Sequence, residues 1–351
     1  MSNTVIGLLP FEPAYRQALK EAAPDLNFVF AADGPVPEEA WRDACAILGN
    51  PTPAQIAGCP GLRWVQLGSA GADSYCVPGV LPETVTLTNA TGSYGHAISE
   101  YMAAVTLLLV KKLHLYRDNQ LQSRWKDEGT VRSISSARVL VVGMGDIGGR
   151  YGRLIHALGA SVTGITRTPR ETPDYADSMG LLADLDSLLP QADVVALALP
   201  NSAETAGLMD ARRLSLMKEG AILVNVGRGS AVDTEALCDA LESGHLSGAA
   251  LDVTDPEPLP AEHRLWRIPS AFITPHVSGG YHMRETYEAI MDICIRNLKA
   301  FASGGALTHL VDRATGYMKK CPVQRMGTVL WWAVPVFLFR KIQEKDRMTA
   351  L

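Results

Sequence analysis

The segment from Arg138 to Gly149, RVLVVGMGDIGG, constrains the fold of this 351-residue chain more than any other. An apolar run leads straight into a Gly-x-Gly-x-x-Gly turn, and a helix-compatible stretch follows. In that order Gly143 permits a tight turn, Gly145 lets a pyrophosphate approach the backbone, and Gly148 lets the helix lie close to the sheet. The helix N-terminus adds amide donors and the positive end of its dipole. The segment therefore predicts a strand, turn and helix that bind a dinucleotide.

Two series of short apolar runs alternate with helix-compatible segments along the chain. The first series reads TVIGLL, NFVF, CAILG, RWVQLG and VTLT, and the second reads RVLVVG, SVTGIT, DVVALALP, AILVNVG, GAALDV and AFITP. Such alternation predicts an α/β protein with two doubly wound, Rossmann-like or flavodoxin-like domains that have parallel sheets. We expect the active site in the cleft between these domains, at the carboxyl ends of the strands.

Two long helical patterns set the expected domain boundaries. One is uninterrupted from Tyr94 to Gln122, with Ile98, Met102, Val105, Leu109 and Leu113 at helical spacing, and the other runs from Tyr281 to Ala302. We expect residues 96–281 to form the dinucleotide-binding domain and residues 1–95 with 282–317 to form a discontinuous substrate-binding domain. The tail, residues 318–351, carries VLWWAVPVFLF between basic flanks. It would lie on a membrane surface, pack against a second subunit, or extend with little order.

Composition narrows the class of partner. A formal net charge of -5 leaves no broad positive field, so we expect no nucleic-acid partner. The six cysteines are scattered without disulfide or metal spacing, which favours a reducing compartment and no metal site. The N-terminal residues do not resemble a signal peptide, and no apolar run is long enough to span a membrane. We therefore expect a cytoplasmic protein, and the absence of GxSxG, HExxH and GxxxxGK motifs disfavours hydrolases.

The end of the second strand of the dinucleotide domain bears on the choice of cofactor. An NAD-binding protein usually has an acidic residue there that binds the ribose hydroxyls, but SVTGIT ends in Thr166. Arg167, Thr168 and Arg170 follow, so two guanidiniums lie where a 2′-phosphate would need neutralising. This pattern favours NADP(H), with NAD(H) as the alternative. The other interpretation of Arg167 and Arg170 is that they are ordinary solvated surface charges.

Three candidate catalytic residues follow three successive predicted strands. Arg228 lies between Gly227 and Gly229, Glu257 lies in DVTDPEP, and His276 lies in ITPHVSGG. The glycines would let the Arg228 loop approach a ligand closely. An imidazolium can stabilise and protonate an oxygen on which negative charge develops, a carboxylate can orient that imidazole, and a guanidinium suits a planar carboxylate. Each residue alone could be structural, and their joint occurrence in one sheet favours catalysis.

From Val5 to Tyr317 the sequence resembles the D-isomer-specific 2-hydroxyacid dehydrogenase family, through GMGDIGG, NVGRGSAVD, GAALDVTDPEPLP and ITPHVSGG in that order. The resemblance implies that Arg228 binds the substrate carboxylate and carbonyl, that His276 is the acid/base, and that Glu257 hydrogen-bonds His276. It also implies that Asp252 holds the nicotinamide carboxamide, that the backbone amides near Ala70 and Gly71 clamp the substrate carboxylate, and that the protein is a homodimer. The expected cofactor-binding set is Gly143, Gly145, Asp146, Ile147, Gly148, Thr166, Arg167, Thr168, Arg170, Pro200, Val226 and Asp252.

Within that family the sequence is most similar to the glyoxylate and hydroxypyruvate reductases, which implies reduction of a small 2-oxo acid to the D-2-hydroxy acid by NAD(P)H. One departure is His96 in GSYGHAISEY, where many relatives have Asn. His96 would either line the substrate pocket, which we favour, or cap or pack the start of the helix. The change weakens an assignment to formate dehydrogenase. The alternative from another class is a binding protein on the same fold that senses NAD(H), like the C-terminal-binding-protein co-repressors.

Overall fold

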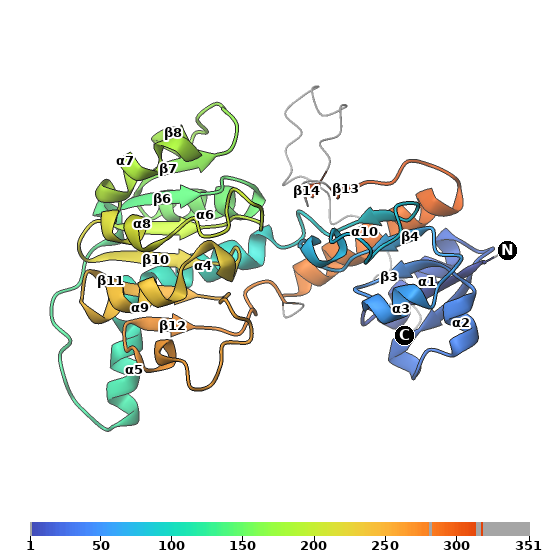
Figure 1. Ribbon diagram of the computed structural model, residues 1–351, viewed down its shortest axis with the longest axis horizontal. Helices are drawn as coiled ribbons and strands as arrows, with labels where there is room; N and C mark the ends of the chain where they lie inside the picture. The colour runs from blue at the N-terminus through green and yellow to red at the C-terminus, as the bar shows by residue number, and fades with distance from the viewer. Residues whose placement is uncertain (1, 281–282, 314–316, 319–351) are drawn as a thin grey trace, which may run out of the picture. The chain divides into compact units, whose positions relative to one another are not determined.

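Two parallel sheets form from the two series of apolar runs (Figure 1). The computed structural model describes residues 2–280, 283–313 and 317–318. The first sheet has the strand order β2-β1-β3-β4-β5, and the second has the order β12-β11-β10-β9-β6-β7-β8. All neighbouring strands in both sheets are parallel. The prediction of an α/β fold with two doubly wound sheets is confirmed.

The strands of the first sheet are β1 (Thr4–Gly7), β2 (Asn27–Phe30), β3 (Ala44–Leu48), β4 (Trp64–Gln66) and β5 (Thr86–Thr88). Those of the second are β6 (Arg138–Val142), β7 (Ser161–Thr166), β8 (Ser178–Leu181), β9 (Val194–Leu197), β10 (Ala221–Asn225), β11 (Leu246–Leu251) and β12 (Ala271–Ile273). A short antiparallel pair, β13 (Val311–Asp312) and β14 (Tyr317–Met318), follows. The edge strand β8 was not predicted, because SMGL is short and only partly buried.

The α-helices are α1 (Pro13–Ala22), α2 (Glu38–Arg42), α3 (Pro53–Ala57), α4 (Gly95–Val110), α5 (Leu113–Leu121), α6 (Asp146–Ala157), α7 (Leu185–Leu188), α8 (Ala211–Leu216), α9 (Thr234–Glu242) and α10 (Arg284–Ala302). None of the helices in the described ranges is both long enough and apolar enough to cross a membrane.

Alternate residues of the central strands enter two different cores, because successive side chains of a strand point to opposite faces of the sheet. In β6, Val139 and Val141 join one hydrophobic cluster while Leu140 and Val142 join another. The helices α4 and α6 pack on the first of these faces, and α9 packs against β11. Both faces are therefore covered, which explains why these strands read as continuous apolar runs.

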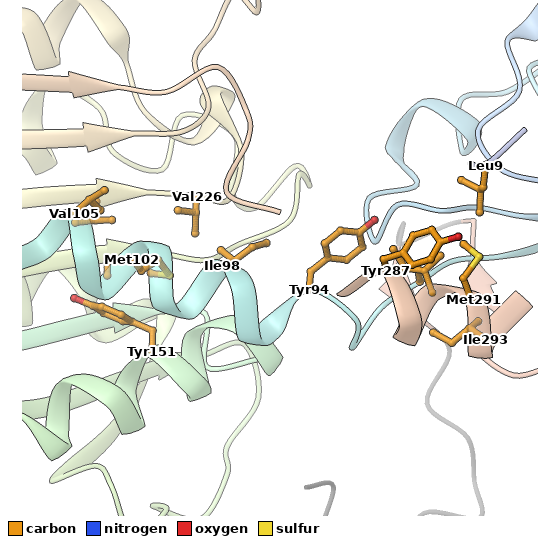
Figure 2. Packing of buried hydrophobic residues seen from close by; sticks show 14 of the residues in the cluster. Leu9, Tyr94, Ile98, Met102, Val105, Tyr151, Val226, Tyr287, Met291 and Ile293 are labelled. Atoms are coloured by element: carbon orange, nitrogen blue, oxygen red, sulfur yellow. The ribbon is translucent and has the colours of Figure 1, made fainter. Parts of the chain in front are cut away.

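The predicted long helix is in fact two helices. The helix α4 ends at Val110, Lys112 adopts a left-handed conformation with φ +56°, and α5 begins at Leu113. Figure 2 shows Ile98, Met102 and Val105 projecting from α4 among the other residues of the cluster, and these three side chains are buried as their spacing predicts. Leu113 is 52% exposed, because the break ends the helical register on which its prediction depended.

The helix α10 packs against α1 of the first sheet. Tyr287 Oη donates to the Pro10 carbonyl at 2.9 Å, its ring contacts Tyr15 edge to face, and Arg284 pairs with Glu12 at 2.5 Å. This packing is what a discontinuous first domain requires. The boundaries themselves, residues 1–95 with 282–317 for the substrate-binding domain and 96–281 for the dinucleotide-binding domain, stay a prediction. Of the predicted tail 318–351, residues 319–351 lie outside the described residues.

Candidate active site

The glycine turn after β6 has the geometry that the sequence predicts. Gly143 has φ +102°, and a β-carbon there would lie 2.5 Å from the Ala198 carbonyl oxygen. A β-carbon at Gly148 would lie 2.1 Å from the Gly143 carbonyl oxygen, so the start of α6 packs directly on the turn. At Gly145 a β-carbon would meet nothing within 4 Å. Two glycines are therefore needed by the fold, and the third leaves open space at the N-terminus of a helix, where a pyrophosphate fits.

The loop that carries Arg228 is fixed by its flanking glycines and by Asn225. A β-carbon at Gly227 would lie 2.5 Å from the Leu199 carbonyl oxygen, and one at Gly229 would lie 1.9 Å from the Thr254 carbonyl oxygen. Asn225 Nδ2 donates to the Arg228 carbonyl at 2.9 Å. The glycines thus permit close packing on neighbouring loops of the protein, which differs from the close approach to a ligand that we expected.

The Arg228 side chain reaches the predicted substrate loop, QLGSAGAD. Its Nε donates to Asp73 Oδ2 at 2.9 Å, Nη2 lies 2.8 Å from the same oxygen, and Nη1 donates to the Gly227 carbonyl at 2.8 Å. A β-carbon at Gly71 would lie 2.1 Å from Arg228 Nη2, so the guanidinium passes directly over this glycine. A guanidinium has more N–H groups than these contacts use, which leaves donors for a ligand carboxylate.

His276 and Glu257 form the predicted pair. His276 Nδ1 lies 2.6 Å from Glu257 Oε1, and the two side chains are 52% and 42% exposed. The carboxylate contacts Nδ1. The second ring nitrogen, Nε2, has no partner in the described part of the chain. This arrangement leaves one imidazole nitrogen available to exchange a proton with a ligand.

Strand order brings these three side chains to one edge of the sheet. Arg228 follows β10, Glu257 follows β11 and His276 follows β12, and these strands are parallel neighbours. The carboxyl ends of parallel strands meet at one edge, which is where ligands bind in open α/β sheets. The glycine turn follows β6 at the same edge, separated from β10 only by β9. Candidate acid/base, anion and dinucleotide groups therefore share one side of the sheet.

Asp252 lies at this edge directly after β11, but its carboxylate is engaged by the protein. The residue is 1% exposed, and its two oxygens accept hydrogen bonds from Thr274, Val277 and Ser278. All of these donors flank His276 in sequence. The family resemblance implies that Asp252 holds the nicotinamide carboxamide, and these protein partners were not predicted from the sequence.

The residues expected at the cofactor ribose lie at the end of β7. Thr166 is 8% exposed, and its hydroxyl donates to the Thr168 carbonyl at 2.8 Å. Arg170 Nη1 donates to the Met144 carbonyl at 3.1 Å, which places this guanidinium beside the glycine turn. Arg167 is exposed at the start of the same loop. The positive charge of Arg170 is thus next to the predicted dinucleotide site.

The other predicted cofactor residues are placed around the same turn. Ile147 packs against the core at the start of α6, and Asp146 pairs with Arg150 at 2.8 Å and lies against Gly95 of α4. Val226 is 7% exposed after β10, and the Pro200 carbonyl after β9 accepts from Thr205.

Ala70 and Gly71 offer two backbone amides beside Arg228. The Ala70 carbonyl accepts from Asn89 Nδ2 at 2.7 Å, and the Gly71 carbonyl accepts from Ser69 Oγ at 2.7 Å. Among the described residues, neither amide finds an acceptor. Because a backbone amide without an acceptor is unfavourable, the loop is suited to bind an anionic ligand.

His96 does not contact the candidate catalytic residues among the described residues. Its side chain is 58% exposed on the first turn of α4, and Nε2 lies 3.2 Å from Glu100 Oε1. No contact between His96 and Arg228, Glu257 or His276 occurs in the described ranges. A role for His96 in the substrate pocket stays a prediction.

Comparisons with known proteins show what this chain is similar to. Residues 103–278 match the model of the D-isomer specific 2-hydroxyacid dehydrogenase NAD-binding domain. A solved family protein from Aeromonas salmonicida is 32% identical, with a TM-score of 0.78 over 89% of this chain and 100% of that one. The chain belongs to the D-isomer-specific 2-hydroxyacid dehydrogenase family. The resemblance found in the motifs is therefore confirmed, and with it the class of NAD(P)-dependent oxidoreductases.

Three other proteins are similar to this chain. The NADPH-dependent glyoxylate/hydroxypyruvate reductase of Sinorhizobium meliloti, solved with NADP and sulfate, is 27% identical, with a TM-score of 0.75 over 90% of this chain and 100% of that one. An uncharacterised protein of Corynebacterium melassecola is 31% identical over 80% of this chain and 92% of its own length. The chain spans 42% of the length of the D-3-phosphoglycerate dehydrogenase of Mycobacterium tuberculosis that it matches.

Sequence reasoning missed several residues of this site. Asp73 lies only two positions after Gly71, so a carboxylate within the predicted anion-binding loop was a signal that could have been followed. Tyr101 and Thr274 gave no such signal. Their hydroxyls meet at 2.6 Å, although the two residues are 173 positions apart in sequence.

Proposed function

We propose that this protein reduces a short 2-oxo acid to the D-2-hydroxy acid with NADPH. The observation that carries the proposal is the pair of His276 and Glu257 at 2.6 Å, in the loops that follow β12 and β11, beside β10, which Arg228 follows. An oriented imidazole beside a guanidinium with spare donors suits a substrate that has a carboxylate next to a carbonyl. The bound nicotinamide would supply the hydride to the carbonyl carbon.

The chain's own residues would supply the proton and the binding of charge. Negative charge develops on the carbonyl oxygen as the carbon is reduced, and protonated His276 would stabilise that oxygen and give it the Nε2 proton. Glu257, which contacts Nδ1, keeps the ring oriented. The products would be the hydroxy acid, the oxidised dinucleotide and neutral His276, and the histidine regains its proton from solvent before the next turnover.

Arg228 and the loop containing Ala70 and Gly71 would hold the substrate carboxylate. The guanidinium passes directly over Gly71. The remaining Arg228 donors therefore lie close to the two unpaired backbone amides. Such fixed donors orient the carbonyl carbon and limit rotation of the bound acid. Glyoxylate and hydroxypyruvate are the substrates we propose, on the likeness to the Sinorhizobium meliloti reductase.

Residues at the end of β7 support NADPH over NADH. Thr166 replaces the carboxylate that would bind the ribose hydroxyls, and Arg170 lies beside the glycine turn, where a 2′-phosphate would need a cation. Thr168 lies between them, with its carbonyl held by the Thr166 hydroxyl. The open space at Gly145 and the helix behind it fit the pyrophosphate.

The test is a matrix of two cofactors and several substrates. NADPH and NADH are each combined with glyoxylate, hydroxypyruvate, pyruvate and phenylpyruvate, and oxidation is followed by the absorbance of the reduced nicotinamide. We expect the highest kcat/KM with NADPH and a two- or three-carbon acid. The alternative is a co-repressor-like sensor. It would be supported by negligible turnover with every acid and by tight dinucleotide binding that drives association with other proteins.

We also propose that the protein is a homodimer. The helix α5 and the segment after it expose a group of large apolar side chains, among them Leu121 at 67% and Trp125 at 106%. A hollow of about 640 Å³ is lined by Tyr116, Trp125 and neighbouring polar residues. Such side chains are costly to leave in water, and a second copy of the chain would cover them.

A further inference from the structure

The carbonyl groups of the loop after β4 are held by donors at the end of β5. The Ser69 carbonyl accepts from the Ala90 amide at 2.9 Å, and the Ala70 carbonyl accepts from Asn89 Nδ2 at 2.7 Å. Because Asn89 and Ala90 are adjacent in sequence, both carbonyls face the same segment of the chain.

A carbonyl that is fixed in direction also fixes the amide of the next residue. The peptide group is planar and trans, so its C=O and N–H point in opposite directions. The Ala70 and Gly71 amides therefore both point away from the end of β5, and neither has an acceptor in the described part of the chain. Successive amides on one side of a turn form a concavity that binds anions. Arg228 adds positive charge at the same loop, since Nη2 would lie 2.1 Å from a β-carbon at Gly71.

Asn89 is fixed so that its donor faces the loop. The residue is 1% exposed, and its backbone amide donates to the His309 carbonyl at 3.1 Å. Its Oδ1 accepts from the Thr91 amide at 3.2 Å. A backbone amide only donates and a carbonyl only accepts, so the two partners determine which side-chain atom is Oδ1 and which is Nδ2. The Asn89 side chain thus holds the Ala70 carbonyl in one direction.

The Ser69 hydroxyl closes the same turn. It donates to the Gly71 carbonyl at 2.7 Å and accepts from Asn50 Nδ2 at 2.8 Å, while Asn50 Oδ1 accepts from the Gly68 amide at 3.0 Å. The three successive carbonyls of residues 69–71 are therefore all bound by donors of the protein. The loop presents amides to a ligand because its carbonyls are held elsewhere.

We propose that Asn89 and Ser69 are positioning residues that aim the Ala70 and Gly71 amides at the substrate carboxylate. The inference rests on the function proposed above and names the side chains that make this loop suited to an anion. Asn89 sets the direction of the Gly71 amide, and Ser69 closes the turn that contains both amides. The carboxylate is bound before and during hydride transfer, so loss of these contacts should raise KM more than it lowers kcat.

The test uses oxamate, a carboxylate whose amide carbonyl is not reduced, with the protein saturated with NADPH. In Asn89→Ala we expect the dissociation constant of oxamate and the KM of glyoxylate to rise at least roughly tenfold, as when one hydrogen bond to a charged group is lost. The kcat should stay within about threefold of wild type, and the dissociation constant of NADPH within about twofold. Unchanged oxamate affinity in Asn89→Ala would overturn the proposal.

Asn89→Asp gives a readout that a structural role alone would not change. Its ionised carboxylate has no donor for the Ala70 carbonyl, whereas the protonated carboxyl regains one. The oxamate dissociation constant relative to wild type should therefore fall as the pH is lowered from about 8 to about 5.5, because a buried carboxyl titrates above its usual range. A ratio independent of pH would contradict the proposal. So would weaker binding in Asn89→Asp alone, because repulsion by the new charge would then explain it.

Asn297→Asp is the matched control. Asn297 is also 1% exposed, and its side chain also binds a backbone amide and a backbone carbonyl, both of Thr308, at 2.8 and 3.0 Å. This variant should lower the melting temperature and leave oxamate affinity unchanged. An equal loss of affinity in Asn297→Asp would make the effect one of stability and overturn the proposal.

Ser69→Ala serves if the Asn89 variants do not fold. It should weaken oxamate binding severalfold, and unchanged affinity there would overturn the proposal. Binding also separates this inference from the proposed function. If wild type binds oxamate but reduces no 2-oxo acid, the proposed function fails while the variants still support the inference. A wild-type protein that binds no oxamate would overturn the inference itself.

Discussion

Asp73 and Arg228 form an ion pair between the loop after β4 and the loop after β10, with Asp73 Oδ2 2.9 Å from Nε and 2.8 Å from Nη2 of the guanidinium. Each side chain is 29% exposed, so solvent screens the pair only in part. The carboxylate takes the side of the guanidinium that carries Nε. The N–H groups at the other end remain for a second carboxylate, so Asp73 would fix the orientation of the group that we propose binds the substrate.

Loss of this ion pair should weaken substrate binding. In Asp73→Ala the Arg228 side chain regains rotational freedom, and ordering such a side chain costs about 0.5–1.5 kcal/mol, so KM for the 2-oxo acid should rise roughly two- to tenfold with a smaller change in kcat. Asp73→Asn keeps an acceptor for Nε and should lie near wild type. Steady-state kinetics measure both, with the exposed Asp25→Ala as control. A KM below the wild-type value in both variants would mean that Asp73 competes with the substrate.

His276→Ala should abolish most of the turnover. General acid–base groups contribute about 10²–10⁴-fold, so kcat should fall by that factor, while the dissociation constant of NADPH should change little. Glu257→Gln retains an acceptor for Nδ1 but loses the charge, and we expect a smaller loss. Stopped-flow measurement of a single turnover, together with a fluorescence titration of the cofactor, checks both statements. A kcat near wild type in His276→Ala would remove this residue from the mechanism.

Two glycines of the turn should respond to alanine in opposite ways. Gly145→Ala places a methyl group where no protein atom lies within 4 Å, so the melting temperature should stay close to wild type while NADPH binding weakens at least about tenfold. Gly148→Ala places a methyl group 2.1 Å from the Gly143 carbonyl oxygen and should destabilise the domain by about 1–3 kcal/mol or more. Thermal unfolding and cofactor titration of both variants separate the two effects. Unchanged cofactor affinity in Gly145→Ala would contradict the proposed pyrophosphate site.

Cofactor preference should depend on the end of β7. Arg170→Ala should raise KM for NADPH with little effect on NADH, because the guanidinium would neutralise a 2′-phosphate. Thr166→Asp should shift preference toward NADH, because a carboxylate there accepts from the ribose hydroxyls and repels the phosphate. The ratio of kcat/KM for the two cofactors is the measurement, and Arg117→Ala, on α5, is the control. An unchanged ratio in both variants would make Arg170 an ordinary surface charge.

Self-association should depend on the exposed apolar group of α5 and the segment after it. If this surface packs against the same surface of a second copy, Trp125→Ser should weaken the dimer. The indole of Trp125 is 106% exposed and is the largest apolar side chain of this surface. Sedimentation velocity over a concentration series measures the change, and Trp266→Ser, at a 49% exposed indole elsewhere on the chain, is the matched control. Equal dissociation constants for Trp125→Ser and wild type would place the interface elsewhere.

Much of the site was predictable because its signals are local. The geometry of Gly143 and Gly148 depends on residues within a few positions, and the pairing of His276 with Glu257 follows from neighbouring strands and a family motif. The break between α4 and α5 was not predictable, because apolar spacing continues through Lys112 while its backbone turns left-handed. The edge strand β8 was missed because it is short and only partly buried, so it gives no clear apolar pattern.

The sequence by itself determined the alternation of strands and helices, the glycine turn and the identity of the groups at the carboxyl edge, because each depends on periodicity and on short spacings. Only the tertiary structure decided which of these groups meet. Arg228 and Asp73 are 155 positions apart, and Tyr101 reaches Thr274 across 173 positions. Contacts over such separations are fixed by how helices and sheets pack, and no local pattern of residues encodes them.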